Sequence, residues 1–503
     1  MYHFIIFNDS SVFKRRASGA YRIATLLRQK NYNVKVIDYL INWNPEAVKD
    51  LLGSLVSEKT IAFGFSYTWM NTEYVKNIIG NLKTLYPNKK YFAGGQQPFQ
   101  HEIGLDLMVT GYVEHALDDI INYLVDDIAP EKTTTSAVLN GILINADIDY
   151  PAPNINDLTV IYQDNDFINK DEVLTIELSR GCRFACKFCC YPFLGFKHST
   201  FRDKNNVKAE LLDNYNRFGI TSYTIADDTL NDDDAKLEML VEVVESLPFD
   251  VDFAAFIRID LIATRPHQME LLKRARVWAH FYGIETFHPA AGKAIGKGMQ
   301  ASRIQDTLLK MRSYMLETLG LYRGTCGLIA GLPHEPVESW VETQQWMREN
   351  WLDQSWAWWP LDITNDKENT IIQSSIALNK EKYGYSEIAD LKYKEDKINY
   401  LKTKKFLTHH QLDDRFFYWQ NKHTDFFGAF EFVHNINATR QTANVSPNFY
   451  ILSYKSLVKN NEELLKLPLE YEAAWQYKTQ NIANYKNSTI EYAKRLTTAS
   501  KML

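Results

Sequence analysis

Four of the five cysteines of the chain lie within a few residues of one another, and this cluster is the feature of the sequence best suited to chemistry. Cys182, Cys186 and Cys189 are spaced C-x-x-x-C-x-x-C, Cys190 follows directly, and Cys326 stands alone. No cysteine precedes Cys182, so the pattern is not that of a disulfide framework. Cysteines grouped this closely indicate metal or redox chemistry in a reducing compartment.

Three thiolates on one short loop can ligate three irons of a four-iron cluster and leave the fourth iron without a protein ligand. An open position of this kind takes a substrate or a cofactor, as it does at a catalytic zinc site. The alternative is a structural zinc site with Cys190 as the fourth ligand, although adjacent cysteines on one strand rarely converge on one ion. The spacing favours the iron–sulfur cluster because the loop directly follows a predicted strand.

Six predicted strands, alternating with helices, must position this loop. Their expected ranges are 173–178, 222–226, 252–258, 278–284, 322–329 and 356–363. Strands that alternate with helices in this way form a parallel sheet, and six of them predict a partial (β/α)6 barrel of TIM type. The active site of such a barrel lies at the carboxyl ends of its strands, which is where the first strand runs into the cysteine loop.

The chain divides into four predicted regions, and the fold class is α/β. Residues 1–125 alternate strands with helices and predict a doubly wound parallel sheet with Asn8, Ser66 and Gly94 at the carboxyl ends of its strands. This region has no G-x-G-x-x-G after its first strand, which disfavours a dinucleotide-binding fold. Residues 126–165 are predicted as a linker, 166–370 as the barrel and 371–503 as a mainly helical domain.

The composition excludes several classes of protein. With 56 Lys and Arg against 62 Asp and Glu, the net charge of −6 argues against binding nucleic acid chiefly by electrostatics. The chain is 45% hydrophobic, which is ordinary for a globular protein. No apolar run approaches the roughly 18 residues of a membrane span. The first residues are predicted as a strand rather than a signal peptide, so we expect a cytoplasmic protein without membrane partners.

The cysteine loop, with Phe188 before its third cysteine, resembles the cluster motif of the radical S-adenosylmethionine (SAM) enzymes. Further similar segments are Asp227-Asp228, Arg258 in an Arg-x-Asp pattern, Gly283-Ile284-Glu285, Lys297-Gly298 and Gly331-Leu332-Pro333-x-Glu335. The resemblance covers roughly residues 173–365. With no cysteines left for auxiliary clusters, it implies a single cluster.

This resemblance implies a [4Fe–4S] cluster and SAM as cofactors. The cluster is expected to be bound by Cys182, Cys186 and Cys189, and its open iron to chelate the amino and carboxylate groups of SAM. One-electron reduction by a flavodoxin- or ferredoxin-like partner then cleaves SAM to a 5′-deoxyadenosyl radical, which abstracts a hydrogen atom from the substrate. The residues expected to contact SAM are Phe188, Asp227, Asp228, Arg258 and Glu285.

Several of these residues also have a structural interpretation. Asp228 could cap a helix, Arg258 could form a salt bridge at the barrel mouth, and Glu285 could be structural. Cys190 is expected to be a small core residue and Cys326 to be buried and inert. The tryptophans between Trp340 and Trp359 are expected in a core or a domain interface, with an aromatic funnel for substrate as the alternative.

Residues 1–125 resemble the cobalamin-binding-like domain that precedes many radical SAM barrels. The similar positions, which we expect at a cobalamin site, are Ser66, Gly94, Gly95 and Gly111. The Asp-x-His-x-x-Gly motif that supplies an axial histidine is absent, because residues 8–16 contain no histidine. Two alternatives follow: cobalamin bound without a histidine ligand, or a domain that keeps the fold and binds none.

These observations predict a radical SAM enzyme whose substrate the sequence does not identify. With cobalamin, the expected reaction is methyl transfer to an unactivated centre. Without it, the expected reaction is an isomerisation, oxidation or coupling that begins with hydrogen abstraction. A non-catalytic metal-binding scaffold is disfavoured, because the additional SAM-site signals would then have no reason to accompany the cysteines.

Overall fold

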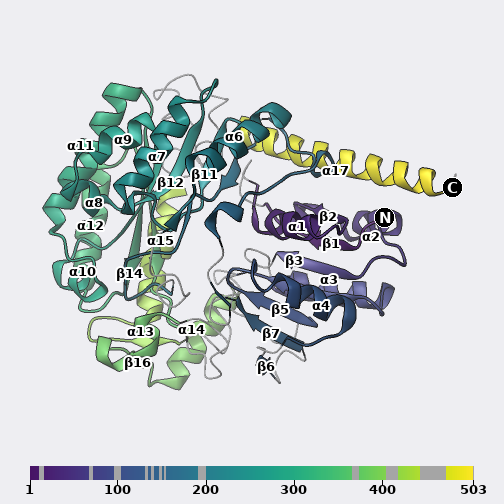
Figure 1. Ribbon diagram of the computed structural model, residues 1–503. Coiled ribbons are helices and arrows are strands. Elements are labelled where there is room, and N and C mark those ends of the chain that lie inside the picture. The colour runs from purple at the N-terminus through teal and green to yellow at the C-terminus, as the bar shows by residue number, and fades with distance from the viewer. Residues whose placement is uncertain are drawn as a thin grey trace. The chain divides into compact units, whose positions relative to one another are not determined.

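The computed structural model describes residues 1–10, 16–66, 72–95, 104–130, 134–136, 141–146, 150–151, 154–170, 172–190, 200–364, 373–403, 417–441 and 472–501. Its contacts divide the chain into two compact units. The first contains Met1–Ile176, Ala209–Thr221 and Glu472–Leu503, and the second contains Glu177–Lys208 and Ser222–Tyr471. Figure 1 labels the elements of both units.

The first unit is built on a seven-stranded sheet with the order β2-β1-β3-β4-β5-β7-β6. Its strands are β1 (Phe4–Phe7), β2 (Val34–Ile37), β3 (Ala62–Ser66), β4 (Lys90–Gly94), β5 (Leu107–Thr110), β6 (Thr134–Ser136) and β7 (Gly141–Asn145). All paired strands are parallel except β6 and β7. The predicted parallel sheet is confirmed.

Residues 126–165 were predicted as a linker, but they supply β6 and β7, which extend the sheet. β7 pairs with β5 along four residues, starting at Ile142. The preceding Gly141 is required there, because a Cβ atom at this position would lie only 2.5 Å from the carbonyl oxygen of Leu105. Strands this short carry too little alternation to be recognised from sequence.

The helices of the first unit that follow its strands match the expected pattern. They are α1 (Gly19–Gln29), α2 (Pro45–Leu55), α3 (Thr72–Leu85) and α4 (Leu117–Asp126). α2 begins as the sequence predicts, since the Asn44 side chain accepts a hydrogen bond of 2.7 Å from the backbone N–H of Ala47 and Pro45 occupies the first turn.

The segments that follow β1 and β2 are held by a buried ionic network. Arg16, which is fully buried, donates to both oxygens of Glu172 at 2.7 and 2.6 Å and lies 3.3 Å from Asp38. Asn8 and Ser10 also donate to the Asp38 carboxylate, at 3.1 and 2.8 Å. Charges this deeply buried are stable only when fully paired, so the network fixes the carboxyl end of β1 in one conformation.

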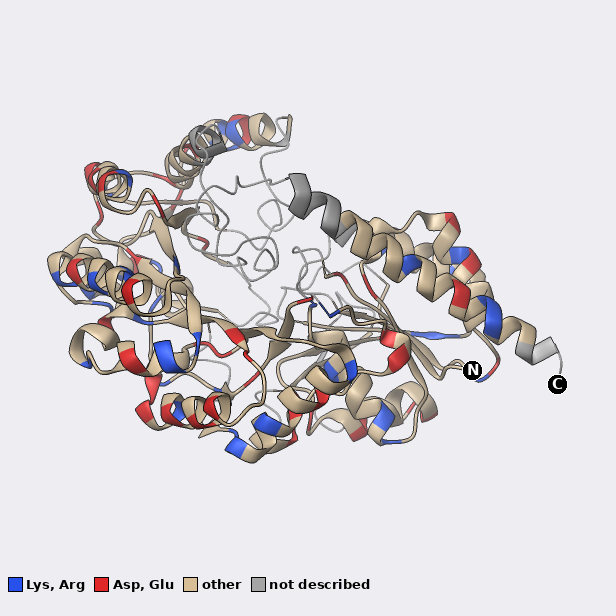
Figure 2. Ribbon diagram, turned by 90° about the horizontal axis from the view of Figure 1, so that it is seen from above, with Lys and Arg blue, Asp and Glu red and all other residues tan. Residues whose placement is uncertain are grey.

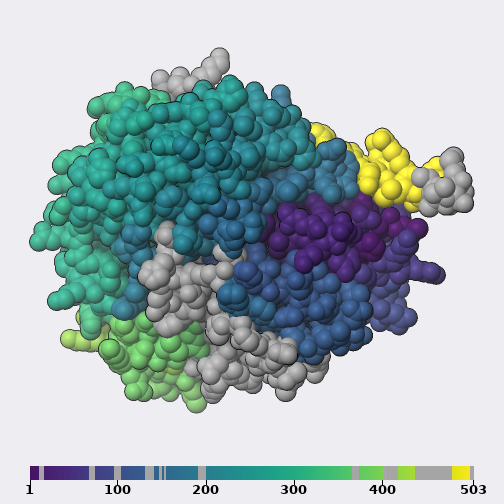
Figure 3. Space-filling model, in the orientation of Figure 1, coloured from purple at the N-terminus to yellow at the C-terminus, as the bar shows by residue number. Residues whose placement is uncertain are grey.

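The C-terminal helix α17 (Glu472–Lys501) is part of the first unit. Tyr485 on this helix is 1% exposed, accepts a hydrogen bond from the backbone N–H of Asp38 at 2.8 Å and packs on Tyr39. Figure 3 shows the helix (yellow) beside the first residues of the chain (purple). The sequence predicts one domain over residues 371–503, but Glu472–Leu503 belongs to the first unit. The apolar face of a helix does not show, from sequence alone, which surface it packs against.

Five of the six predicted barrel strands belong to the second unit, and β8 (Leu174–Ile176) belongs to the first. Together they form a six-stranded sheet with the order β15-β14-β13-β12-β11-β8. The strands are β8 (Leu174–Ile176), β11 (Ser222–Ile225), β12 (Asp252–Ile257), β13 (Val277–Glu285), β14 (Arg323–Ala330) and β15 (Ser355–Pro360). The neighbouring strands from β11 to β15 are parallel, which confirms the partial barrel.

Helices alternate with these strands. They are α6 (Lys204–Phe218), α7 (Asp234–Glu245), α8 (Ile259–Thr264), α9 (Gln268–Arg274), α10 (Pro289–Ile295), α11 (Ala301–Leu319) and α12 (Val337–Asn350). Figure 1 shows α7, α9 and α11 on one side of the strands. Asp233 caps α7 by accepting from the N–H of Ala235 at 3.0 Å, as the run of aspartates predicts. Beyond the barrel lie α13 (Ser375–Leu378), α14 (Leu391–Thr403) and α15 (Phe426–Gln441).

The tryptophans of the second unit are mostly core residues. Trp356 and Trp358 on β15 both donate to the side-chain oxygen of Gln344 on α12, at 3.0 Å each. Trp340 and Trp358 also contact the ring of Phe432 on α15. Trp359 differs, because its side of β15 faces away from this layer and it is 46% exposed. The expected core role is thus confirmed for Trp340, Trp351, Trp356 and Trp358, which are all buried.

Acidic and basic residues are interspersed along the helices that Figure 2 shows. None of the helices in the described part of the chain combines the length and the hydropathy that crossing a bilayer would need.

Replacing Tyr485 by Phe should lower the free energy of unfolding by about 1–3 kcal/mol, because the buried N–H of Asp38 loses its acceptor. Chemical denaturation followed by circular dichroism measures the change. Tyr400→Phe, at a tyrosine that is 54% exposed, is the control. Superimposable curves for Tyr485→Phe and the unmodified chain would contradict the assignment of α17 to the first unit.

Candidate functional site

The cysteine loop is held by its backbone and leaves its thiols half-buried. Cys182, Cys186, Cys189 and Cys190 are all free and of intermediate exposure. The N–H of Lys187 donates to the carbonyl of Ile295 at the end of α10, and its carbonyl accepts from Ile376 in α13, both at 3.0 Å. Two helices of the second unit therefore clamp the middle of the loop.

Asp227, at the carboxyl end of β11, anchors the segment that leads into the loop. Its carboxylate accepts hydrogen bonds from the backbone N–H groups of Leu178 and Ser179 at 2.8 and 3.0 Å and from the Ser179 hydroxyl at 2.5 Å. The side chain is 1% exposed. Its acceptor positions are thus occupied by the protein, and Asp227 fixes the backbone that leads into the loop.

Lys236 on α7 completes this anchor, and no sequence motif pointed to it. Its ammonium group is fully buried and pairs with Asp232 at 2.8 Å and with Asp227 at 3.4 Å. It also donates to the Ser179 hydroxyl at 2.8 Å and to the Thr229 carbonyl at 2.9 Å. We call Lys236, Asp227, Asp232 and Ser179 the anchor network. The only sequence signal was an apolar helix with a lysine on its buried face.

Asp228, the next residue, lies close enough to Cys182 and Cys190 for its charge to affect their pKa values. Burial raises the pKa of the Cys182 thiol above its ordinary value, and the Asp228 carboxylate acts in the same direction. The pKa of the Cys190 thiol is likewise raised, by burial first and by Asp228 second. Cys182 also lies 3.9 Å from the Thr229 hydroxyl. Thiolates at this loop therefore need a positive charge to offset both burial and the carboxylate.

Arg258, which follows β12, supplies a positive charge to the loop. Its guanidinium donates to the Cys186 sulfur at 3.4 Å and lies 3.9 Å above the centre of the Phe184 ring. Asp260 holds the other side of the guanidinium with bonds of 3.1 and 2.6 Å. The Arg-x-Asp pattern is thus a local clamp, and it directs the arginine onto a cysteine.

The backbone of Arg258 is fixed as well. The buried side chain of Asn231 accepts from its N–H at 2.8 Å and donates to its carbonyl at 3.0 Å. Asn231 is in turn held by Gln268 at 2.9 Å. The sequence does not predict a role for these two amides, because isolated Asn and Gln residues form no recognisable motif.

Glu285 ends β13 in a left-handed conformation, with φ of 67°. Its carboxylate pairs with Lys297 at 3.1 Å, and Lys297 also donates to the carbonyl of Gly283 at 2.5 Å. A Cβ atom at Gly283 would lie 2.5 Å from the Glu285 carboxylate, so glycine is needed to admit the pair. Lys297 lies 5.8 Å from the centre of the Phe188 ring, which links the Gly-Ile-Glu and Lys-Gly signals to the cysteine loop.

Cys326 and Glu335 are buried, in contrast to the half-buried cysteines of the loop. Cys326 on β14 is fully buried, and burial raises the pKa of its thiol, as expected for an inert cysteine. Burial also raises the pKa of Glu335 to about 7, against the lowering effect of its hydrogen bond from Thr286. Cys190 is half-buried and not a core residue in the strict sense.

The four positions expected at a cobalamin site belong to the first unit. Ser66 ends β3, and its hydroxyl lies 3.4 Å from the Cβ position of Gly19, the first residue of α1. Gly94 ends β4, Gly95 has φ of 148° and Gly111, after β5, has φ of 80°. They thus follow three adjacent parallel strands at one edge of the sheet.

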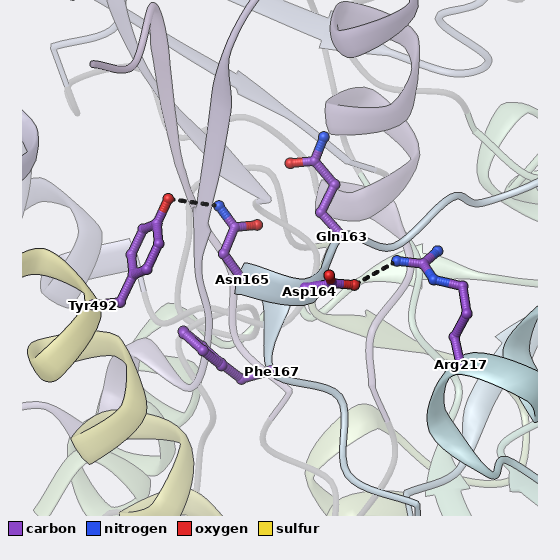
Figure 4. A pocket seen from close by; sticks show the side chains of 6 residues that line it. All are labelled: Gln163, Asp164, Asn165, Phe167, Arg217 and Tyr492. Carbon is purple, nitrogen blue, oxygen red and sulfur yellow. Dashed lines mark hydrogen bonds and ion pairs between the residues drawn. The ribbon is translucent and has the colours of Figure 1, made fainter. Parts of the chain in front are cut away.

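A hollow of about 510 Å³ lies elsewhere in the first unit (Figure 4). Gln163, Asp164, Asn165, Phe167, Arg217 and Tyr492 line it. Arg217 and Asp164 pair at 3.0 Å, and the amide of Asn165 lies 3.4 Å from the Tyr492 hydroxyl. No predicted site residue lines this hollow.

Residues 176–347 match the family model of the radical SAM superfamily. The match spans the cysteine loop, the anchor network, Arg258, Glu285 and Glu335. A radical SAM domain implies a [4Fe–4S] cluster, SAM and an external electron donor.

Among curated proteins, the chain is 28% identical over 182 residues to the hopanoid C-2 methylase of Rhodopseudomonas palustris, which covers 35% of this chain and 33% of that protein. It is 22% identical over 262 residues to the anaerobic magnesium-protoporphyrin IX monomethyl ester cyclase of Synechocystis, with coverages of 48% and 51%. The chain thus matches about a third and about half of the length of these relatives.

Among solved structures, the fold is similar to that of the radical SAM methyltransferase TsrM from Kitasatospora setae. The TM-score is 0.58 with 14% identity, covering 77% of this chain and 79% of that chain. The cobalamin-dependent SAM radical enzyme OxsB is similar with a TM-score of 0.52 and 15% identity, covering 76% of this chain and 56% of that one. These likenesses establish the fold.

The two adjacent aspartates should respond differently to amidation. Asp227→Asn removes the negative partner of a buried lysine and should lower the free energy of unfolding by about 3–5 kcal/mol. Asp228→Asn should lower it by no more than about 1.5 kcal/mol, the net value of an ordinary hydrogen bond. Denaturant titration of the two variants side by side measures the difference, and equal losses would refute the anchor role of Asp227.

Proposed function

Because residues 176–347 form a radical SAM domain, we propose that this chain is a cobalamin-dependent radical SAM methyltransferase that acts on an unactivated centre. Cys182, Cys186 and Cys189 are the proposed cluster ligands. The observation that carries this proposal is the cysteine loop itself, which is clamped by its backbone while its thiols stay half-exposed beside Asp228 and Arg258.

The donor set fits a [4Fe–4S] cluster with one open iron. Among the residues that the structure describes, no three His, Cys, Asp or Glu side chains are gathered closely enough to hold a single ion. Three thiols on one loop with a fixed backbone could ligate three irons of a [4Fe–4S] cluster and leave the fourth open. When bound, the cluster supplies the electron that cleaves SAM and so generates the radical for hydrogen abstraction.

The residues around the loop would have distinct tasks. Asp228 accepts hydrogen bonds from the SAM ammonium group, because the carboxylate of Asp227 is already used by the protein. Arg258 donates to the Cys186 thiolate and offsets its charge. Phe188 and Glu285, the latter paired with Lys297, would contact SAM beside the loop. The anchor network holds the start of the loop and takes no part in the reaction.

Cobalamin, which carries a methyl group in such enzymes, would be held by the first unit at the carboxyl edge of β3, β4 and β5. Among the described residues, only the Val109 carbonyl, at an ordinary 3.6 Å, lies near a Cβ placed at Gly94. Protein packing therefore does not require glycine at this position, whereas a ligand close to the backbone would. Asn8 and Ser10 are committed to Asp38, so they would not serve as ligands to the cofactor.

The relatives support this choice over the cobalamin-free alternative. The structures of TsrM and OxsB that resemble this fold are described as a methyltransferase and as cobalamin-dependent, and a curated relative is a methylase. An isomerase, oxidase or coupling enzyme remains the second candidate, favoured by the missing histidine of the first loop. We also propose a flavodoxin- or ferredoxin-like electron donor and a cytoplasmic location, since a cluster of reduced thiols needs a reducing compartment.

Cys182→Ala, Cys186→Ala and Cys189→Ala should each abolish cluster assembly and the formation of 5′-deoxyadenosine from SAM. Cys190→Ala is the matched control, because this neighbouring thiol is of similar exposure and should leave both intact. Iron analysis and electron paramagnetic resonance after anaerobic purification measure the cluster. Full cluster content in a Cys189→Ala preparation would exclude this ligand set.

Cobalamin should be retained by the first unit without a histidine ligand. We expect stoichiometric retention after anaerobic incubation with hydroxocobalamin and gel filtration, with an absorption spectrum that lacks histidine ligation. Gly94→Val should reduce retention, while Gly53→Val, at a helical glycine with open surroundings, should not. Complete loss of corrin from the unmodified chain, with 5′-deoxyadenosine still formed, would favour the cobalamin-free candidate.

A further inference from the structure

The inner face of the second sheet can be traced residue by residue. Phe256 on β12 pairs in register with Phe281 on β13, and their rings are 5.2 Å apart. A Cβ atom at Gly327 on β14 would lie 3.0 Å from the Phe281 ring and 3.3 Å from the ring of Trp359 on β15. Side chains alternate along a strand, so these four positions share one face of the sheet.

This face is opposite to the one that the helices cover. A Cβ atom at Gly324, three residues before Gly327, would instead contact Trp351 at 2.5 Å, and Trp356 and Trp358 bond to Gln344 of α12. The β15 residues that alternate with Ala357 and Trp359 are Trp356 and Trp358, and both are buried on the helix-covered face. The face with Phe281 therefore lines the inside of the partial barrel.

The inner face is partly exposed, and its exposed positions below Arg258 and Gly283 are apolar. Trp359 is 46% exposed, Ala226 is exposed, Phe256, Phe281, Ile329 and Ala357 are of intermediate exposure, and Gly327 is buried. We define the apolar floor as Ala226, Phe256, Phe281, Gly327, Ile329, Ala357 and Trp359. The rings of Phe281 and Trp359, 6.2 Å apart, meet above Gly327, so three aromatic side chains form a continuous row across the sheet.

The apolar floor is continuous with the SAM-side residues. Arg258 follows Phe256 by two residues, and its side chain reaches Cys186. Gly283 follows Phe281 by two residues, and its inner face holds the Glu285–Lys297 pair. Two residues along a strand span roughly 7 Å. The floor thus lies one step deeper in the barrel than the residues that border the cluster loop.

We propose that the apolar floor binds the reacting part of the substrate, and that this part is an uncharged ring system with a mostly hydrocarbon surface. The inference rests on the proposed radical SAM function and adds the substrate class. A charged or strongly hydrated group would lose its water here without a partner, which costs several kcal/mol. Flat hydrocarbon or aromatic rings instead stack on the row of aromatic side chains.

The small residues of the floor set its shape. Ala226, Gly327 and Ala357 alternate with the rings. Gly327 and Ala357 pair in register, and neither covers the floor with a large side chain. A larger or charged side chain at Ala357 would project over the floor beside Trp359. Among the described residues, no hydrogen bond joins Ala357 to the cysteine loop, so substitution there tests the floor separately from the cluster.

Two dyes that differ only by a sulfonate test the proposal. The neutral N-phenyl-1-naphthylamine and the anionic 1-anilinonaphthalene-8-sulfonate are titrated into the anaerobically purified full chain and followed by fluorescence. We expect the neutral dye to bind at least tenfold more tightly. Ala357→Glu and Ala357→Phe should each weaken its binding at least tenfold, whereas Leu352→Glu, at a leucine that is 59% exposed, should not.

The proposal is overturned if the anionic dye binds as tightly as the neutral one, or if both Ala357 variants bind the neutral dye like the unmodified chain. The uncharged Ala357→Phe variant decides the matter if Ala357→Glu fails to fold. Formation of 5′-deoxyadenosine from SAM with dithionite, measured on the unmodified preparation, tests the proposed function separately. A chain that binds the dye as expected but does not cleave SAM refutes the function and not the apolar floor.

Discussion

The buried ammonium group of Lys236 is the constraint on which the candidate site depends. It joins the end of β11, the segment before the cysteine loop and the start of α7 through Asp227, Ser179, Thr229 and Asp232. Taking these charges out of water is costly, and the cost is offset only when every partner is in place. A network of this kind allows few alternative arrangements, so the first cysteine starts from a fixed backbone.

Charged side chains of both signs act on the thiols of the cysteine loop. Burial and Asp228 both disfavour a thiolate at Cys182, yet a metal ligand must be deprotonated. Arg258, held by Asp260 and by the amide of Asn231, brings a permanent positive charge to the neighbouring Cys186. Hydrogen bonds to cluster sulfurs also influence reduction potential. The arginine expected at SAM is therefore placed where it acts on the loop.

The sequence was sufficient for the parts of the molecule that repeat or carry a motif. The six barrel strands, the parallel sheet of the first unit and the caps of α2 and α7 follow from periodicity and turn chemistry. Lys236 and Asn231 were missed because a single polar residue on a buried helix face has no spacing to recognise. The position of α17 was missed for a related reason: Tyr485 meets Asp38 across a separation of 447 residues, which no local pattern encodes.

The carboxyl ends of the strands carry different kinds of residues in the two units. After β1 and β2, Arg16, Glu172 and Asp38 fill the space with paired charges, whereas glycines follow β4 and β5. In the second unit, the pairs formed by Arg258 and by Glu285 stand at the rim, and the residues below them are small or aromatic. Charges at the rim can hold a polar cofactor, while an uncharged interior excludes water from the reacting group.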